Sequence, residues 1–291
     1  METQNIKPTV DLYNATDPLC SFCWAFEPVL RKFRYQYASY IAKDTIVMGG
    51  MIEKWENDGS GNGNNSWSAF DVAKYWRELG DYSRMVIDGR IWLDEPIQSS
   101  YPSSQVFEIV RRDYPEQASL FLRKLRESVM MWNEDISNPD ILKGILESID
   151  LDAETILEDA DSFEGRMLLK GDLALTRSLT VTGFPTLVLI NEDNAGVKVV
   201  GAQSLDALVS ALKQALPEGT EIIPNPLPSL DIAMEATPLM LTREIEILYD
   251  LEEDDVEGFV NMIVGKENYQ KGELLGQTYY KKISNTLAGR S

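Results

Sequence analysis

Two cysteines, Cys20 and Cys23, are the residues of this sequence whose type and spacing best suit chemistry. Three interpretations fit such a pair: a dithiol that cycles to a disulfide, part of a metal site, or two buried thiols without a function. Residues at i and i+3 in the first turn of a helix lie within bridging range. Zinc normally takes four Cys or His ligands, and the sequence has no other Cys and no His. The pattern favours the redox dithiol and predicts no metal, since zinc would need carboxylates or a second chain.

The elements that must position this pair are a strand before it and a helix after it. Val10 to Asn14 predicts a short strand, and Asp17-Pro18 predicts a turn. A helix is expected from Ser21, with a kink at Pro28. The apolar residues at roughly helical spacing are Trp24, Val29, Leu30, Phe33 and Tyr37. A thiol at the start of a helix meets unpaired N–H groups and the positive end of the helix dipole, which favour the reactive thiolate.

Composition excludes several classes of function. The net charge of −20 argues against binding to a phosphate backbone, which depends on clustered Lys and Arg. No apolar run approaches the length of a bilayer span, and Met1 to Val10 shows no signal peptide. We therefore expect a cytoplasmic protein that binds neither nucleic acid nor membrane. In that compartment a catalytic or sensing pair is favoured over a structural disulfide.

A second strand is predicted at Thr45 to Met48, closed by Gly49-Gly50. Strand, helix and strand in this order form a βαβ unit with the cysteines at the mouth of its crossover. Asn57 to Ser66 is rich in Gly and Asn and predicts a surface loop. It lacks the Gly-Lys-Ser/Thr of a phosphate-binding loop.

The region from about Ser66 to Leu179 carries almost only helical signals. Leu122, Leu125, Val129 and Trp132 predict one face of a long helix. Asn138-Pro139 opens the next predicted helix, which carries apolar residues at Ile141, Leu142, Ile145, Leu146 and Ile149. Asp152 is expected to cap a short helix, and residues 163–179 predict another. Met130, Met131 and the tryptophans of this region are interpreted as core.

Strand signals return at residues 183–190, where an apolar run follows Gly183-Phe184-Pro185-Thr186. Val197 to Val200 predicts the hairpin partner, and a helix capped at Ser204 follows. Prolines between 217 and 228 predict a stiff linker. Beyond it an acidic unit is expected, with one helix over residues 256–264 that ends at Gly265. The acids at 252–255 fit a helix cap with a solvated face, and a partner-binding surface is the alternative.

The whole order resembles the DsbA-like family of the thioredoxin superfamily, in which an all-helical domain is inserted into a thioredoxin fold. Two motifs carry the resemblance: the run from Asp17 to Trp24, and Val181 to Thr186, which is similar to the family's cis-proline loop. Gly49-Gly50 after the second strand adds to them. The resemblance covers roughly residues 8–216. It implies an α/β fold with these parts: thioredoxin-fold first part (1–56), helical insertion (57–179), thioredoxin-fold second part (180–216), and a Pro-rich linker with an acidic helical extension (217–291).

Within that family the chain looks like a cytosolic bacterial subgroup that includes the adaptor delivering the regulator Spx to the ClpXP protease. The cues are the motif from Asp17 to Pro28 and the extension Arg243 to Leu251. That adaptor class carries a His/Cys-rich zinc segment at its N-terminus, and this chain has none.

The resemblance also assigns roles. It implies that Cys20 is the exposed nucleophile, that Cys23 is the buried resolving thiol, and that Pro185 is cis and faces Cys20. The residues implied to contact substrate are Phe184, Gly183, Ser21, Phe22 and Trp24. Asp17 and Glu27 either relay a proton to the buried thiol or serve only as turn and surface acids.

The dipeptide Ser21-Phe22 replaces the Pro-His of the strongly oxidising members. Because Phe22 cannot stabilise a thiolate by charge, we expect a Cys20 pKa closer to that of thioredoxin and a less oxidising pair.

Two hypotheses follow for the function. The first is a thiol–disulfide oxidoreductase or isomerase that acts, without a cofactor, on protein or small thiol substrates. The second is an adaptor that presents a client to a ClpXP-type protease, with dispensable thiols and with a client-binding role for the C-terminal extension. The Cys pair with Pro185 favours the first hypothesis, and the extension favours the second. Glutathione-using isomerases fit less well, because they typically carry a single Ser at the pair.

Overall fold

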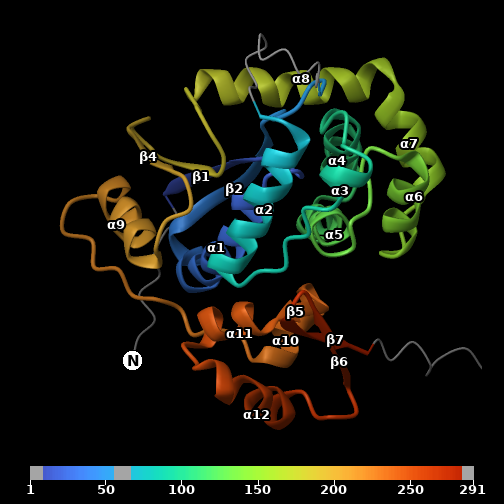
Figure 1. Cartoon of the computed structure of the whole chain (residues 1–291). Helices are drawn as coiled ribbons and strands as arrows, with labels where there is room; N and C mark the ends of the chain where they lie inside the picture. The colour runs from blue at the N-terminus through green and yellow to red at the C-terminus, as the bar shows by residue number, and fades with distance from the viewer. Residues whose placement is uncertain (1–8, 56–66, 284–291) are drawn as a thin grey trace, which may run out of the picture.

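The computed structural model describes residues 9–55 and 67–283, and a four-stranded sheet lies at its centre (Figure 1). The strand order is β2-β1-β3-β4. β1 runs parallel to β2 and antiparallel to β3, and β4 is antiparallel to β3. The strands are β1 (Val10–Thr16), β2 (Ile41–Met48), β3 (Thr186–Asn191) and β4 (Gly196–Val200). The predicted second strand begins at Ile41, four residues earlier than expected, because those residues continue the pairing with β1.

The register of this sheet brings three chain segments to one edge. Thr16, the last residue of β1, pairs with Met48 of β2, and Ala15 pairs with Thr186 at the start of β3. The turn before the cysteines, the two glycines after β2 and the proline before β3 therefore meet at this edge.

Two helices pack against the sheet from the thioredoxin-like part of the chain. α1 (Ser21–Tyr37) continues through Pro28, and α9 (Leu205–Ala215) is capped by Ser204, as predicted. Their apolar faces form one core with Leu12 and Leu189 of the sheet. A short 3₁₀ turn over Ala38–Tyr40 joins α1 to β2.

Helices alone make up the described part of the insertion, as the sequence predicts. They are α2 (Ala69–Ser83), α3 (Ile91–Asp94), α4 (Tyr101–Asp113), α5 (Ala118–Arg126), α6 (Pro139–Glu147), α7 (Ala153–Asp161) and α8 (Phe163–Ser178). Asp152 caps α7, as expected. The predicted Gly/Asn-rich loop, Asn57 to Ser66, lies outside the described residues.

The prediction of one long helix through Trp132 is wrong in part. α5 ends at Arg126 and continues as a π-helical turn, Glu127–Met131, so the residues after it leave the α-helical face. Met130 and Met131 are buried, as expected, whereas Trp132 is 42% exposed and meets Tyr279 edge to face with ring centroids 5.9 Å apart.

The C-terminal extension is not helical only, and this corrects the sequence analysis. Beside its helices it forms a three-stranded antiparallel sheet in the order β5-β7-β6. A turn at Leu275-Gly276, both with positive φ, joins β6 to β7. The elements are α10 (Leu230–Ala236), β5 (Leu239–Leu241), α11 (Thr242–Tyr249), α12 (Glu253–Ile263), β6 (Tyr269–Leu274) and β7 (Gln277–Lys282).

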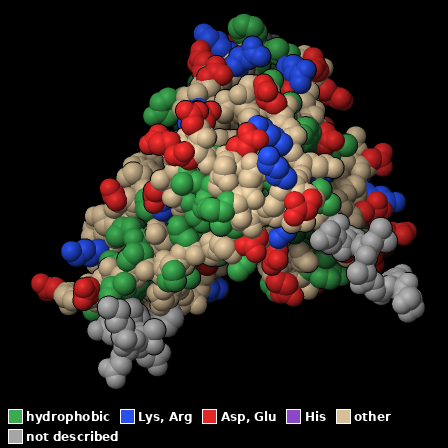
Figure 2. Space-filling view, turned by 90° about the horizontal axis from the view of Figure 1, so that it is seen from below, with side chains coloured by type: hydrophobic (Ala, Val, Ile, Leu, Met, Phe, Trp, Pro, Cys, Tyr) green, Lys and Arg blue, Asp and Glu red, His purple; other side chains and the backbone are tan. Residues whose placement is uncertain are grey.

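The proline-rich segment before this unit is fastened to the end of α1. The Ile223 N–H donates to the Tyr40 hydroxyl at 2.8 Å, and the Asn225 N–H donates to the Gln36 carbonyl at 2.7 Å. The C-terminal unit then lies beneath α1 and the insertion (Figure 1), and Leu239 and Leu241 join the core of the insertion. Seen from below, acidic side chains are scattered over the molecule with apolar patches between them (Figure 2).

Candidate functional site

Cys20 and Cys23 lie at the start of α1, as the sequence predicts. Cys20 is the N-cap residue, and its sulfur accepts a hydrogen bond from the Cys23 N–H at 3.1 Å. Both thiols are free, and each residue is only 4% exposed. The expectation of an exposed Cys20 beside a buried Cys23 is therefore wrong for this conformation, because Phe22, Phe184 and neighbouring side chains of the insertion surround Cys20.

Asp17 shapes the turn that leads into the pair. Its fully buried carboxylate accepts hydrogen bonds from the Leu19 N–H, the Met51 N–H and the Ser100 hydroxyl at 2.7–2.9 Å. Burial raises the pKa of Asp17, although these donors oppose the shift. A carboxyl group with a raised pKa three residues before Cys20 keeps the proton-relay hypothesis open for Asp17.

The proline loop faces the same site. The Phe184–Pro185 peptide bond is cis, which confirms that expectation, and the Pro185 carbonyl accepts from the Gly201 N–H at 2.8 Å. The ring of Phe184 occupies the space beside Gly49, where a Cβ atom would lie 2.0 Å from the ring. A side chain at Gly49 would therefore displace the Phe184 ring of the proline loop.

An aromatic pocket opens beside Cys20, between the thioredoxin-like part and the insertion. It measures about 300 Å³ and is lined by Cys20, Ser21, Phe22, Met51, Ile52, Trp55, Trp67, Val72, Tyr75, Trp76, Trp92 and Phe184. Its rings contact one another, with centroids 5.0 Å apart for Trp55 and Trp92 and 5.1 Å apart for Trp67 and Tyr75. A pocket of this composition suits an apolar or aromatic side chain. The tryptophans predicted as core residues include three that line this pocket, Trp67, Trp76 and Trp92. The aromatic wall they form was not predicted from the sequence.

Trp24 does not belong to that pocket, which corrects its expected contact with substrate. The side chain is fully buried, and its indole N–H donates to the Val86 carbonyl at 2.9 Å. The Arg123 guanidinium lies over its ring, 4.2 Å from the centroid. Trp24 joins α1 to the insertion.

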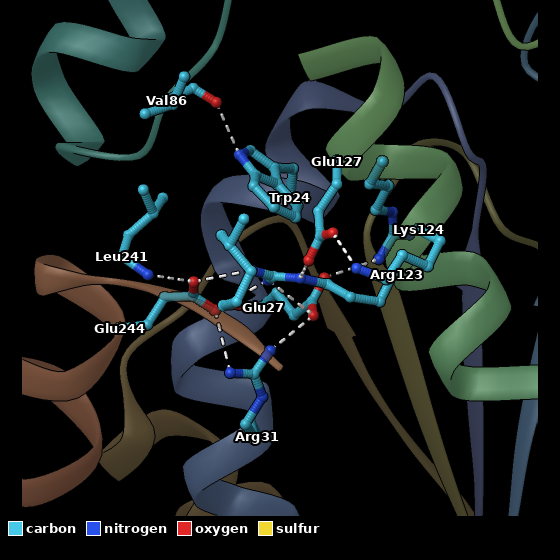
Figure 3. A network of polar contacts seen from close by, with 11 residues as sticks. Trp24, Glu27, Arg31, Val86, Arg123, Lys124, Glu127, Leu241 and Glu244 are labelled. Atoms are coloured by element: carbon cyan, nitrogen blue, oxygen red, sulfur yellow. Dashed lines mark hydrogen bonds and ion pairs between the residues drawn. The ribbon is translucent and has the colours of Figure 1, made fainter. Parts of the chain in front are cut away.

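A charged network lies on the other side of α1 (Figure 3). Arg123 donates to both carboxylate oxygens of Glu244 at 2.8 Å and to Glu127 at 2.9 Å. Arg31 bridges Glu244, at 3.0 Å, and Glu27, at 2.8 Å. Glu244 comes from α11, so the network joins the C-terminal unit to α1 and α5.

Glu27 sits among three arginines, Arg31, Arg123 and Arg126. Burial would raise the pKa of Glu27, but the charges of Arg123, Arg31 and Arg126 lower it to about 2. A carboxylate held ionised in this way is a poor proton acceptor at neutral pH. The relay hypothesis therefore loses support for Glu27, and its description as a surface acid is wrong.

Arg126 is the charged residue behind the thiols that sequence reasoning missed. It is 5% exposed, lies at the end of α5, and donates to the Thr16 hydroxyl at 2.5 Å. Burial raises the pKa of Cys20 and the hydrogen bond with the Cys23 thiol adds to the shift, whereas the hydrogen bond from the Cys23 N–H opposes it. Burial also acts on Cys23, but the hydrogen bond from Cys20 and the charge of Arg126 lower its pKa. The pair thus holds one negative charge more readily than two.

Within the described residues, no group of three or more His, Cys, Asp or Glu side chains is arranged to hold a metal ion. The helices of the same residues include none that is long and apolar enough to cross a bilayer.

Comparison with known proteins shows which families the chain resembles. A thioredoxin family model matches residues 13–210. The ClpXP adapter protein SpxH of Halalkalibacterium halodurans is 30% identical over 280 residues, covering 96% of this chain and 89% of the relative. SpxH of Bacillus subtilis is 26% identical, covering 96% and 91%.

Two solved structures share the fold. A protein described as a disulfide isomerase, from Nitrosomonas europaea, has a TM-score of 0.59 at 18% identity, covering 71% of this chain and 97% of its own. The cytosolic disulfide reductase DsbM from Pseudomonas aeruginosa has a TM-score of 0.54 at 17% identity, covering 70% and 100%. The expected thioredoxin fold of the DsbA-like type is confirmed.

Proposed function

Because the chain belongs to the thioredoxin family and to the family of SpxH adapter proteins, we propose that it is an adapter that presents a protein client to a ClpXP-type protease in the bacterial cytoplasm. By the resemblance of its motifs, the expected client is the regulator Spx.

The C-terminal unit carries this proposal. The SpxH relatives align over 96% of this chain. The structures described as a disulfide isomerase and a disulfide reductase align over about 70% of it, although the match includes 97% and 100% of their own chains. The remainder of this chain therefore has its counterpart in adapters and not in those redox proteins. Glu244 and Lys32 fasten the unit to the thioredoxin-like part, where the Lys32 ammonium donates to the Ile247 carbonyl at 3.0 Å and pairs with Asp250. A unit that redox chemistry does not require, built firmly into the fold, fits a binding role.

A degradation assay tests the adapter proposal. We expect purified protein to accelerate the degradation of Spx by ClpXP, and we expect the double variant Cys20→Ser/Cys23→Ser to accelerate it equally. No acceleration by the wild type, with ClpXP shown active on a tagged control substrate, would rule the proposal out.

A second activity, thiol–disulfide exchange, is favoured by a separate observation. Cys23 lines one cavity with cis-Pro185, and Cys20 lines the aromatic pocket with Phe184. That pocket suits an apolar residue near a client cysteine. In the exchange, a Cys20 thiolate attacks one sulfur of a client disulfide and releases the other as a thiolate. Cys23 then attacks Cys20, which frees the client and leaves the pair oxidised.

The reduction of a model protein disulfide tests this activity. We expect turnover by the wild type that is lost in Cys20→Ser, while Cys23→Ser accumulates the mixed disulfide. Full turnover by Cys20→Ser would show that the pair does not carry the reaction.

A further inference from the structure

We propose that Arg126 is a positioning residue that stabilises the thiolate of the Cys20–Cys23 pair, and that it supplies from the helical insertion the positive charge that Ser21-Phe22 lacks. The inference rests on the second proposed activity, thiol–disulfide exchange, and is independent of client delivery.

The contacts of Arg126 tie its guanidinium to the chain directly before the pair. Nη2 donates to the Thr16 hydroxyl at 2.5 Å and to the Asp17 carbonyl at 3.4 Å. Nη1 pairs with Glu27 at 3.3 Å. Thr16 ends β1 and Asp17 begins the turn to Cys20. The guanidinium of Arg126 is therefore held next to the chain segment that leads into the cysteine pair.

A cavity joins Arg126 to the resolving thiol. It measures about 200 Å³, and its walls include Thr16, Cys23, Glu27, Arg126 and Pro185. Nε of Arg126 is buried and has no hydrogen-bond partner among the residues that the structure describes. A buried cationic donor without a partner is costly, and an anion within its reach would compensate for that cost. Cys23, on the wall of the same cavity, becomes such an anion when it ionises.

Other charged and titratable groups around the pair also act on the charge of its thiolate. Glu27 offsets part of the charge of Arg126, and Arg123 offsets Glu27 in turn. Asp17 lies beneath the turn, and Tyr75 of α2 faces Cys20 from the insertion. Arg126 lowers the pKa of Cys23 and opposes the burial that raises the pKa of Cys20. In a buried site the effect of a single cation is larger than in water.

Stabilising the thiolate serves the second step of exchange. When Cys23 attacks the mixed disulfide it must give up its proton, form the Cys20–Cys23 bond and release the client thiolate. A thiolate already favoured by Arg126 shortens the life of the mixed disulfide. It also stabilises the reduced pair, which makes the pair a stronger oxidant.

Thiolate absorbance at 240 nm, titrated with pH, tests the inference in wild type, Arg126→Met and Arg126→Lys. We expect Arg126→Met to raise the apparent pKa of the pair by about 1 unit or more, because the loss of a neighbouring cation commonly shifts a pKa by that amount. The glutathione equilibrium should shift about tenfold toward the oxidised pair, which corresponds to about 30 mV. Arg126→Lys should restore most of both changes.

Arg111→Met is the control, because Arg111 is a half-buried arginine of the insertion that pairs with carboxylates, Asp172 and Glu108, and lines neither cavity beside the thiols. It should lower stability and leave the thiolate pKa unchanged. A folded Arg126→Met with the wild-type pKa would overturn the inference. If Arg126→Met does not fold, Glu27→Gln tests the inference instead. Removal of the carboxylate that opposes Arg126 should lower the pKa of the thiol pair. An unchanged or raised pKa would contradict the inference.

The failure of this inference differs from the failure of the exchange proposal. Wild type that reduces no disulfide refutes exchange, whereas normal exchange by the wild type with an unaltered Arg126→Met refutes only the role of Arg126.

Discussion

The first turns of α1 have an aromatic side and a charged side, and the two are built for different tasks. Beside Cys20, the aromatic pocket has mainly apolar walls and a volume of about 300 Å³. Behind Cys23, the arginines and glutamates are committed to one another and to Glu244. The aromatic side can bind a client side chain without breaking an ion pair. The charged side holds the molecule's parts together and sets the electrostatics of the thiols.

Glu244→Gln should give the largest effect, on the charged side. Glu244 is 1% exposed and accepts from Arg123, Arg31 and the Leu241 N–H. Removing its charge leaves two buried arginines short of a partner, a change that typically costs about 3–5 kcal/mol. Urea denaturation should show this loss, with early exposure of α11 in hydrogen exchange.

Glu253→Gln is the control for that variant. Its pair with Arg84 lies on the surface, with the Glu253 side chain 65% exposed, so the change should cost less than about 1 kcal/mol. Equal losses for the two variants would mean that burial of the network does not govern the attachment of the C-terminal unit.

The pH dependence of stability tests the charge of Glu27 on the same side. The folded pKa of Glu27 is about 2, below the usual 4.5, so its stabilising contribution is complete above about pH 4.5 and is lost as pH falls toward 2. The shift corresponds to about 3 kcal/mol. Stability measured by denaturant from pH 7 to 2 should fall less steeply in Glu27→Gln than in the wild type. Parallel curves would show that Glu27 ionises normally.

The cysteine pair and the loops around it were predictable from sequence, whereas the aromatic wall was not, and particular residues show why. The Cys pair, Gly49-Gly50 and Pro185 carry local signals, because a motif, a strand end and a turn each constrain a few neighbouring residues. The register of β1 with β2 and β3 then brings them together.

The charged side depends on contacts that no local pattern encodes. Arg126 meets Glu27 across 99 positions, and Arg31 meets Glu244 across 213. A buried arginine in a helix has the same spacing as an exposed one, so Arg123 and Arg126 could not be separated from surface residues. The C-terminal sheet was missed for a related reason: β5 has three residues, and β6 and β7 are half exposed and polar. Only the turn at Leu275-Gly276 signalled it.

Gly49→Ala should give a smaller effect than Glu244→Gln or the loss of the Glu27 charge, and one confined to the aromatic side. The new Cβ would lie 2.0 Å from the Phe184 ring, which can move because it is the end of a side chain, so we expect a loss of about 1–2 kcal/mol. The displaced ring alters the wall beside Cys20, so the rate of disulfide reduction should fall while client degradation by ClpXP continues. Gly171→Ala on α8 is the control, since no described atom lies within 4 Å of its added Cβ. If the two variants reduce a model disulfide at the same rate, the packing of Phe184 on Gly49 does not shape the site; if Gly49→Ala instead abolishes client delivery, the aromatic side serves the adapter role as well.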